Sequence, residues 1–407
     1  MPSATTSEPF MRLLVLDTIH GGGVITLALR EQGYSVDCVD VYRGEDGITP
    51  DAALKYQYSC CIAPVHLDPD YPLLHAGMPV ITHHQAVGIL IGANLPDLMI
   101  EITGERGKTT TAYALAHLMQ GRGILHTSSG TVQYPGRVLL SKTSITPASL
   151  IAPAREARNI NGWFIAESSL GVSGRGDLGI LTTASDYRIA NGKRSALAAK
   201  CEHLKTCKTL LLPGDIGLDH PNQHTVGEIV SCEGTTLSYD HNGIRGSFVH
   251  PLLTLKGYRY PLMTAAAAAC LLGIDPHPLS SFEALPGRMQ VREENGCLII
   301  DASNSGTNCE TSCEAAAYGG AIRPDAPIHL VIGQDEHAVC ENFAESEIIR
   351  TIEEIRPEIV TIVSLPGPAE TTAGYPDCRV ATSLHDAIQK SEKRPDTILL
   401  LAVKTWR

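Results

Sequence analysis

The stretch LMIEITGERGKTTT, residues 98–111, decides the fold of this chain. Its first part, Leu98 to Ile102, is a short apolar run that predicts a strand, and a helix is expected from about Thr109 to Gln120. A glycine-lysine loop lies between them. Glycines let backbone N–H groups approach a phosphate, a lysine reaches the β and γ oxygens, and a following hydroxyl suits magnesium. The stretch therefore predicts a site for a nucleoside triphosphate with Mg²⁺.

The loop differs from the ordinary phosphate-binding loop at its start. Ile102 occupies the position of the first glycine, which leaves a shortened Gly-x-x-Gly-Lys spacing. A chance match is the alternative, and the strand before the loop and the helix after it argue against chance. The residues expected around the nucleotide phosphates are Gly104, Glu105, Arg106, Gly107, Lys108, Thr109 and Thr110, with the Thr109 hydroxyl as a magnesium ligand.

Upstream of the loop, the chain predicts a small Rossmann-like domain. An apolar run from Arg12 to Asp17 precedes a glycine turn at residues 21–23 and a helical pattern that continues through Arg30. A strand over Ser35 to Val41 completes a β-α-β unit. Two further strands are expected near residues 59–63 and 79–82. The dinucleotide-binding fingerprint is incomplete, so dinucleotide binding is not favoured here.

Downstream of the loop, strands again alternate with helices, which favours mostly parallel sheets. The predicted strands are Gly162–Ala166, Leu178–Thr182, Thr209–Leu212, Cys297–Asp301, His329–Ile332, Ile359–Val363 and Ile398–Leu401. The fold class is therefore α/β, with three consecutive domains. We expect a Rossmann-like domain over residues 1–95, a central ATP-binding domain over 96–285, and a last Rossmann-like domain over 286–407.

The bulk properties narrow the class of protein. The 407 residues carry a formal charge of −12, which argues against a nucleic-acid partner because such binding needs a basic surface. The longest apolar run, Met263 to Ile274, is short of the roughly 20 residues that span a bilayer and suits a packed core helix. No signal pattern precedes Arg12, so no membrane partner and a cytoplasmic location are expected. The 12 cysteines lack metal-knuckle spacing and are expected to be reduced and mostly buried.

The shortened loop resembles that of the Mur ligase family, in which it opens the central ATPase domain. Three more stretches resemble family elements in the same order: Glu167-Ser168-Ser169, Pro286-Gly287-Arg288, and Leu298–Asp301 followed by Ser305-Gly306-Thr307-Asn308. The resemblance implies the three-domain architecture of these ATP-dependent ligases. It also implies that Glu167 helps to hold magnesium, that Arg288 faces phosphate at a hinge, and that the element with Asp301 and Asn308 meets the nucleotide ribose.

Each of these elements has an ordinary structural alternative. Glu167 can be a solvated strand end, Asp301 can cap the turn that follows it, and Arg288 can form a hinge salt bridge. The chain also departs from the family at two positions. Tyr187 follows Asp186 where many members carry a metal-binding histidine, and Met263 stands where an asparagine usually precedes an alanine-rich helix.

Lys200 has two open interpretations. The stretch Ala198-Ala199-Lys200 resembles the position at which some relatives carry a carbamylated lysine, whose carbamate would bridge metal or position the acyl phosphate. Lys200 can equally be an ordinary surface lysine. The catalytic residues that the resemblance implies are Lys108, Glu167, Lys200 and Arg288.

Three N-terminal stretches resemble the coenzyme F-430 synthetases, the Mur-ligase-like enzymes that finish the nickel tetrapyrrole cofactor of methanogens. They are Leu16–Gly22, Val39–Arg43 and Thr82–Val87. This resemblance implies a small-molecule substrate, the nickel tetrapyrrole seco precursor. One of its propionates would be phosphorylated by ATP, and a carbon nucleophile on the macrocycle would attack the acyl phosphate to close a carbocyclic ring. Such an intermediate needs charge neutralisation by Lys108, Mg²⁺ and Arg288 more than it needs a protein nucleophile.

The substrate side of the site is expected in the N-terminal domain. Its histidines, His20, His66, His83 and His84, are candidates to meet peripheral carboxylates or nickel, although any one of them can be a core or surface residue. Arg43 is a candidate carboxylate clamp. Two other functions remain open. One is an amide-forming ligase that joins an amino acid to a carboxylate, and the other is a non-catalytic nucleotide-binding regulatory protein, which Tyr187 and Met263 motivate.

Overall fold

A computed structural model of the chain describes residues 11–44, 46–92, 95–304, 306–335, 343–363 and 378–405. The chain forms two compact units, one up to Ser281 and one from Phe282 onward, and each is described by itself. The predicted division at residues 95 and 285 stays a prediction. Ser305, part of one predicted family element, lies outside the described residues.

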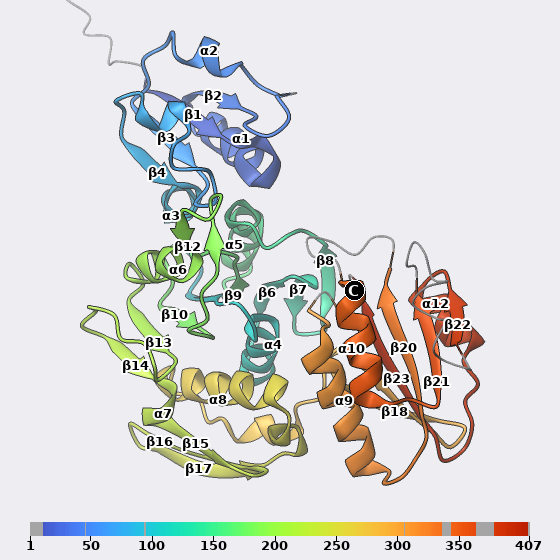
Figure 1. The fold of residues 1–407 in the computed structure, drawn as a ribbon. Helices are drawn as coiled ribbons and strands as arrows, with labels where there is room; N and C mark the ends of the chain where they lie inside the picture. Colours follow the sequence, from blue (N-terminus) through green and yellow to red (C-terminus); the bar gives the residue numbers. More distant parts are fainter. Residues whose placement is uncertain are drawn as a thin grey trace, which may run out of the picture. The chain divides into compact units, whose positions relative to one another are not determined.

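The first unit begins with a four-stranded parallel sheet in the order β2-β1-β3-β4 (Figure 1). Its strands and helices are β1 (Arg12–Leu16), α1 (Gly23–Glu31), β2 (Ser35–Val39), α2 (Pro50–Ala53), β3 (Cys60–Ala63), β4 (Val80–Thr82) and α3 (His83–Gly92). The two inner strands, β1 and β3, are apolar and mostly buried, because an inner parallel strand is covered on both faces, whereas the edge strands β2 and β4 are partly exposed. The predicted Rossmann-like arrangement is confirmed.

The second sheet of this unit has eight strands in the order β14-β13-β10-β5-β9-β6-β7-β8. Its strands are β5 (Leu98–Thr103), β6 (Gly123–Thr127), β7 (Gly130–Tyr134), β8 (Val138–Ser141), β9 (Trp163–Glu167), β10 (Leu178–Leu181), β13 (Thr209–Leu212) and β14 (Gln223–Thr225). The helices between them are α4 (Lys108–Leu118), α5 (Ile151–Asn159) and α6 (Ala196–Leu204), and a short β-ribbon is formed by β11 (Arg188–Ile189) and β12 (Arg194–Ser195). The sheet is parallel from β14 to β6, as predicted, whereas the antiparallel edge β6-β7-β8 was not predicted.

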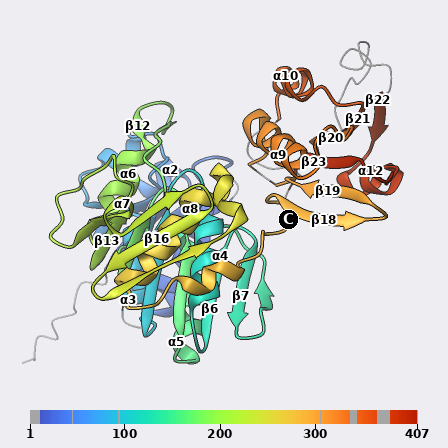
Figure 2. The ribbon, with the colours of Figure 1, turned by 90° about the horizontal axis from the view of Figure 1, so that it is seen from below.

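An alanine-rich helix and a small antiparallel sheet complete the first unit. The helix is α8 (Lys256–Leu271), and the sheet contains β15 (Val230–Glu233), β16 (Thr236–His241) and β17 (Ile244–Val249), preceded by α7 (Val226–Ile229). Figures 1 and 2 show α8 beside this sheet, and α8 also packs on α4. Residues 265–269, all alanine, are fully buried, so the predicted core helix is confirmed. It already begins at Lys256, and Met263 therefore lies within it rather than before it.

The second unit is built on a six-stranded sheet in the order β18-β19-β23-β20-β21-β22, parallel except for the pair β18 and β19. Its elements are β18 (Gln290–Glu294), β19 (Cys297–Asp301), α9 (Cys309–Ile322), β20 (Ile328–Gln334), α10 (Glu345–Ile355), β21 (Ile359–Val363), β22 (Cys378–Ala381), α12 (Leu384–Lys390) and β23 (Ile398–Lys404). The four strands predicted for this part are all present. The edge strands β18 and β22 were missed, because most of their residues are only partly buried or exposed and neither strand gives a continuous apolar run.

The two sheets of the first unit share one hydrophobic core. A single cluster contains Leu13 and Ile25 from the N-terminal sheet layer together with Ile124 and Phe164 from the central sheet, with residues of α3 and α5 among them. Burial of such side chains stabilises the fold by roughly 1.5–3 kcal/mol each. This shared core fixes the carboxyl edge of the N-terminal sheet relative to the central sheet. Among the described residues, none of the helices has the length and apolar character that crossing a membrane requires.

Candidate active site

The predicted phosphate loop lies at the carboxyl end of β5, between its two neighbours β9 and β10. Ile102 pairs with Glu167 at the end of β9, and Thr103 pairs with Leu181 at the end of β10. Parallel strands end at the same edge of a sheet, and ligands of open α/β sheets bind at that edge. The loop therefore meets the residues that follow both neighbouring strands.

The backbone of the loop requires its two glycines. Gly104 has a φ of 149° and Gly107 a φ of 83°, both in the region that favours glycine. A Cβ on Gly104 would lie 2.0 Å from the Thr182 Oγ1, so a larger residue cannot be accommodated there without rearrangement. The Thr182 hydroxyl donates to the Arg106 carbonyl at 2.6 Å, and the Glu105 N–H donates to the Thr183 hydroxyl at 2.9 Å. Thr182 and Thr183 hold the loop and were missed in the sequence, because they follow another strand, β10, and are distant from the loop along the chain.

Lys108 and Glu167, the cation and the carboxylate of the site, form an ion pair. The Lys108 ammonium donates to the carbonyl oxygens of Gly104 and Glu105, each at 3.1 Å, and lies 3.9 Å from the Glu167 Oε1. The Thr109 hydroxyl donates to the Glu167 Oε2 at 2.8 Å. The same oxygen accepts from the Ser128 N–H at 3.1 Å, and the Ser128 and Thr109 hydroxyl oxygens are 3.2 Å apart. Glu167 is 2% exposed, so the alternative of a solvated strand end is wrong.

These residues fit a magnesium nucleotide. Carboxylate and hydroxyl oxygens are the donors that Mg²⁺ prefers, and Glu167, Thr109 and Ser128 bring such oxygens together. Gly107 precedes the first residue of α4, where the unpaired N–H groups of the helix favour a phosphate. Ser128 follows β6 and carried no signal in the sequence. The structure thus brings the predicted loop and Glu167 into one group and adds Ser128 to it.

Lys200 lies in α6 and is 1% exposed, so the alternative of an ordinary surface lysine is wrong. Its ammonium lies 4.6 Å from the centre of the Tyr187 ring and has no hydrogen-bond partner among the described residues. Burial, and then the charge of Lys108, lower the pKa of Lys200 to about 8. Asp186 caps the same helix, because its Oδ1 accepts from the Leu197 N–H at 2.9 Å. Tyr187, which stands where many family members have a histidine, thus covers the lysine.

Three predicted nucleotide contacts belong to the second unit. Asp301 is 1% exposed, and its Oδ1 accepts from the Ser303 N–H at 3.1 Å, which is a local turn contact. The Asn308 side chain caps α9 by accepting from the Thr311 N–H at 2.9 Å. Arg288 is partly buried and follows Gly287, whose φ is 69°. The nucleotide roles of Asp301, Asn308 and Arg288 stay predictions.

A second concave site lies at the carboxyl edge of the N-terminal sheet. A pocket of about 250 Å³ is lined by His20, Pro64, Val65, His66, His83, His84, Thr146, Pro147, Ser169 and Leu170. All four histidines singled out in the sequence therefore meet in one place. Arg43 does not line this pocket; its side chain is exposed on the loop after β2, and its N–H donates to the Asp40 Oδ1 at 3.0 Å.

Two of the pocket histidines are held by the backbone. The His83 Nε2 pairs with the Leu16 carbonyl at 2.9 Å, and the His84 Nε2 with the Ser169 carbonyl at 2.8 Å. Since a carbonyl only accepts, both Nε2 atoms carry the proton. Burial lowers the pKa of His83 to about 4 and the pKa of His84 well below its usual value. Both rings are therefore neutral near pH 7. His84 stacks on the His203 ring with centroids 4.4 Å apart.

The eleven cysteines among the described residues are free thiols. Five of them are buried and six are partly buried, so the expectation that most are buried is only partly met.

Comparison with solved structures gives the fold. MurC, the UDP-N-acetylmuramate-alanine ligase of Thermotoga maritima, aligns with a TM-score of 0.52 at 12% identity, over 97% of this chain and 95% of that one. A UDP-N-acetylmuramoylalanyl-D-glutamyl-2,6-diaminopimelate D-alanyl-D-alanyl ligase of Acinetobacter baumannii aligns with a TM-score of 0.55 at 14% identity, over 88% and 83% of the two chains. The chain therefore has the Mur ligase fold, as the phosphate loop predicted.

Sequence comparison identifies the family. Residues 291–405 match the family model "Coenzyme F430 synthetase CfbE, C-terminal domain". A coenzyme F(430) synthetase of Methanosarcina acetivorans is 30% identical, over 97% of this chain and 99% of the relative. Another coenzyme F(430) synthetase, from Methanocaldococcus jannaschii, is 25% identical, over 81% and 85%. Because these relatives are named as synthetases and the fold is that of the Mur ligases, the interpretation as a non-catalytic regulatory protein is set aside. The chain belongs to the coenzyme F430 synthetase family and is an ATP-dependent ligase with the Mur ligase fold.

Proposed function

We propose that this ligase carries out a ring closure on a nickel tetrapyrrole, the last step in the formation of coenzyme F430. A propionate carboxylate of the seco precursor takes the γ-phosphoryl group of ATP, and ADP leaves. A macrocycle carbon, after loss of its proton to a base, then forms a bond to the activated carbonyl carbon, and inorganic phosphate leaves with the electrons of the broken C–O bond. The names of the two methanogen relatives support this substrate class.

The observation that carries the proposal is the short segment that connects the phosphate loop with the histidine pocket. Glu167 contacts Lys108 and Thr109 of the phosphate site, and Ser169, two residues further on, lines the pocket. The wall of the pocket and the phosphate site thus share one segment of backbone, and we propose that a carboxylate bound in the pocket reaches the phosphate loop along it. Bringing both reactants together in this way is a large part of what an enzyme contributes to a bimolecular step.

The residues of the phosphate loop supply charge and position. Lys108 would neutralise the charge that develops on the phosphoryl group during its transfer, as loop lysines do in phosphoryl transfer. Thr109 and Glu167, with Ser128 beside them, would hold Mg²⁺, which shields the phosphate oxygens when it is bound. From the second unit, Arg288 would face phosphate, and Asp301 and Asn308 would meet the nucleotide ribose.

Lys200 is proposed to act as a carbamate. Its lowered pKa, about 8, leaves a fraction of about one tenth as free amine at pH 7, and only the free amine adds to carbon dioxide. The resulting anion would remove the cost of a buried cation next to Lys108. It would also provide oxygen atoms for metal or for positioning the acyl phosphate. We further propose that His20, His83, His84 and Arg43 bind the substrate, the first three from the pocket wall.

The direct test supplies the purified protein with ATP, Mg²⁺ and the nickel seco precursor. We expect ADP, phosphate and ring-closed product in equal amounts, without any added amine. The amide-forming alternative predicts a strict need for an amino acid and no ring-closed product. Because the new bond is intramolecular in the proposed reaction, addition of amino acids should leave the rate unchanged.

A further inference from the structure

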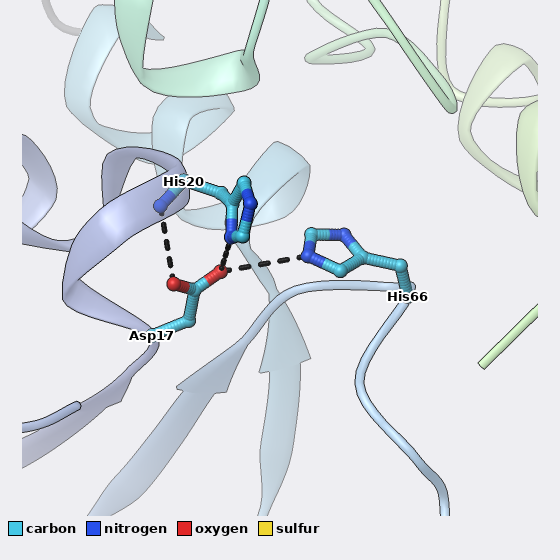
Figure 3. A group of neighbouring side chains, drawn as sticks. All are labelled: Asp17, His20 and His66. Atoms are coloured by element: carbon cyan, nitrogen blue, oxygen red, sulfur yellow. Dashed lines mark hydrogen bonds and ion pairs between the residues drawn. The ribbon is translucent and has the colours of Figure 1, made fainter. Parts of the chain in front are cut away.

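The carboxyl edge of the N-terminal sheet gathers side chains that can bind a metal. Asp17 follows β1, and His66 lies just beyond the end of β3. His20 comes from the helical turn Thr18–Gly22 that begins next to Asp17. One ligand atom from each of these three residues lies within 4.8 Å of the other two (Figure 3). This Asp-His-His cluster is separate from the Thr109 and Glu167 group of the phosphate site.

One carboxylate oxygen of Asp17, Oδ2, faces the rings of His20 and His66. It is fully buried and has a φ of 70°, a backbone conformation that is rare for residues other than glycine and is often found at functional sites. Its Oδ1 accepts from the Ile19 and His20 N–H groups at 3.0 and 3.1 Å. This leaves Oδ2 to the rings: it lies 2.8 Å from the His20 Nδ1 and 3.5 Å from the His66 Nε2 (Figure 3).

A poorly satisfied buried atom points to a further ligand. The His66 Nε2 atom is buried, although its side chain is 28% exposed, and among the described residues it has no hydrogen bond closer than its 3.5 Å contact with the Asp17 Oδ2. A buried ring nitrogen with only a long contact is poorly satisfied, and a metal ion is one of the few ligands that would satisfy it beside a carboxylate. His66 and His20 also line the pocket, so an ion held by them has an entry path and an open side.

The spacing suits a tetrahedral ion. Bonds of about 2.0–2.2 Å to a tetrahedral ion such as Zn²⁺ place neighbouring ligand atoms about 3.3–3.6 Å apart. The distance from the Asp17 Oδ2 to the His66 Nε2, 3.5 Å, already lies in this range. The distance to the His20 Nδ1, 2.8 Å, would have to lengthen slightly to reach it. Three protein ligands with a fourth position left open are typical of zinc sites that act on a substrate.

We propose that Asp17, His20 and His66 bind one divalent transition-metal ion of the zinc type, with the fourth position facing the pocket. An oxygen ligand, such as a carboxylate of a small molecule, completes the coordination. The nickel of a tetrapyrrole does not suit this cluster, because its macrocycle already supplies the equatorial donors and leaves no room for three side chains at one face. The site is therefore for a separate ion, and it does not depend on the proposed ring closure.

The test titrates the metal-free full chain with Co²⁺, whose visible absorption reports its coordination, and then displaces Co²⁺ with Zn²⁺. Among the described residues, Cys309, Cys313 and Glu354 form the other group of ligand atoms, so all proteins carry Cys313→Ser to remove thiolate binding. The probe is the metal alone, without nucleotide or Mg²⁺. We expect one equivalent of Co²⁺ with the intense bands of a tetrahedral site, displaced by one equivalent of Zn²⁺.

Two variants and a matched control locate the ion. His66→Gln and Asp17→Asn should weaken Co²⁺ binding by more than about 100-fold, since even outer-shell changes cost about 10–100-fold. His75→Gln is the control, because His75 is exposed and pairs with the Pro69 carbonyl. Should Asp17→Asn fail to fold, His66→Gln decides alone, since among the described residues the partly exposed His66 ring nitrogen Nε2 would lose only its long contact, 3.5 Å, with the Asp17 Oδ2. The absence of tetrahedral Co²⁺ bands, or equal affinity in His66→Gln and His75→Gln, would overturn the proposal. Neither result bears on ADP release, which tests the proposed function separately.

Discussion

The four-stranded parallel sheet and the mostly parallel central sheet of the first unit each place polar side chains at the carboxyl ends of their parallel strands, yet the two edges are built differently. At the central sheet, Lys108 and Thr109 come from one continuous stretch of sequence, and Glu167 and Ser128 are added from the ends of two neighbouring strands. At the N-terminal sheet, Asp17, His66 and His83 come from the ends of three strands and have no common motif.

The difference also appears in the electrostatics. The phosphate edge, which is the carboxyl edge of the central sheet, has the buried carboxylate of Glu167 beside Lys108. It also has a second lysine, Lys200, whose pKa is lowered by burial and by the charge of Lys108. At the histidine edge, which is the carboxyl edge of the N-terminal sheet, burial lowers the pKa values of His83 and His84, so both rings are neutral near pH 7. The carboxylate of Asp17 lies at the same edge. The phosphate edge is thus suited to binding a polyanion, and the histidine edge to binding an uncharged or metal-containing ligand.

The largest effect is expected at Lys108. Lys108→Ala should lower the rate of ADP formation by about 10²-fold or more, because it removes a charge that stabilises the transferring phosphoryl group. The rate is measured at saturating substrate. Lys205→Ala is the matched control, because Lys205 pairs with Glu202 on the surface and should leave the rate unchanged. A Lys108→Ala protein with near-normal turnover would remove the phosphate edge from the mechanism.

The next effect concerns the magnesium requirement. Glu167→Gln should raise the Mg²⁺ concentration for half-maximal activity by about 10–100-fold, because it replaces the carboxylate that accepts from Thr109 and Ser128 with a neutral amide. The measurement is a Mg²⁺ titration of ADP release. Glu202→Gln, at an exposed position, serves as the control. An unchanged Mg²⁺ dependence would show that Glu167 plays only a structural part.

A smaller effect is expected at Lys200. Lys200→Ala should lower turnover by about tenfold or more, the lower end of what supporting groups of a metal site contribute. Added acetate or propionate should restore part of the activity if the native group is a carbamate. Lys205→Ala treated in the same way controls for general effects of the salt. Loss of activity without rescue at any carboxylate concentration would contradict the carbamate.

The smallest effect is on stability at the histidine edge. The folded pKa of His83, about 4, lies below its usual value of 6.5, so between these values the unfolded chain binds a proton that the folded chain does not. The free energy of unfolding therefore falls as the pH is lowered from 6.5 to 4. His83→Gln keeps an N–H donor for the Leu16 carbonyl and should remove of order 1 kcal/mol of this fall.

Denaturant unfolding at several pH values measures the His83 effect. His75→Gln, at an exposed position, should retain the full slope. His126 and His203 also have pKa values lowered to about 4, so the variant reduces the slope without abolishing it. Identical pH profiles of His83→Gln and the native protein would mean that His83 is not neutral in the folded state.

The fold was largely predictable, because a parallel strand buried on both faces leaves a continuous apolar run. Thr209–Leu212 and Cys297–Asp301 were predicted to the residue. The antiparallel strand Val138–Ser141 was missed, because its four residues are all exposed and it packs on one neighbour only. Edge strands of this kind depend on tertiary pairing that the local sequence does not encode.

The site was predictable where its residues follow one another and not where separate strands bring them together. The loop from Gly104 to Thr109 is a local signal, whereas Ser128 and Thr182 join it only after the sheet has formed. Asp17 gave no sign of its role, because a positive φ at a residue other than glycine cannot be read from composition or spacing. The burial of Lys200 was likewise hidden, since a lysine in a short helix is most often exposed.

The most direct test of the account measures ADP release by the purified protein with ATP and Mg²⁺, with and without the nickel seco precursor, in the native chain and in Lys108→Ala. The account predicts ADP release that depends on the precursor, needs no amine, matches the ring-closed product in amount, and is lost in Lys108→Ala. Ring-closed product formed without ATP consumption, or no ATP consumption at all with the precursor present, would contradict it.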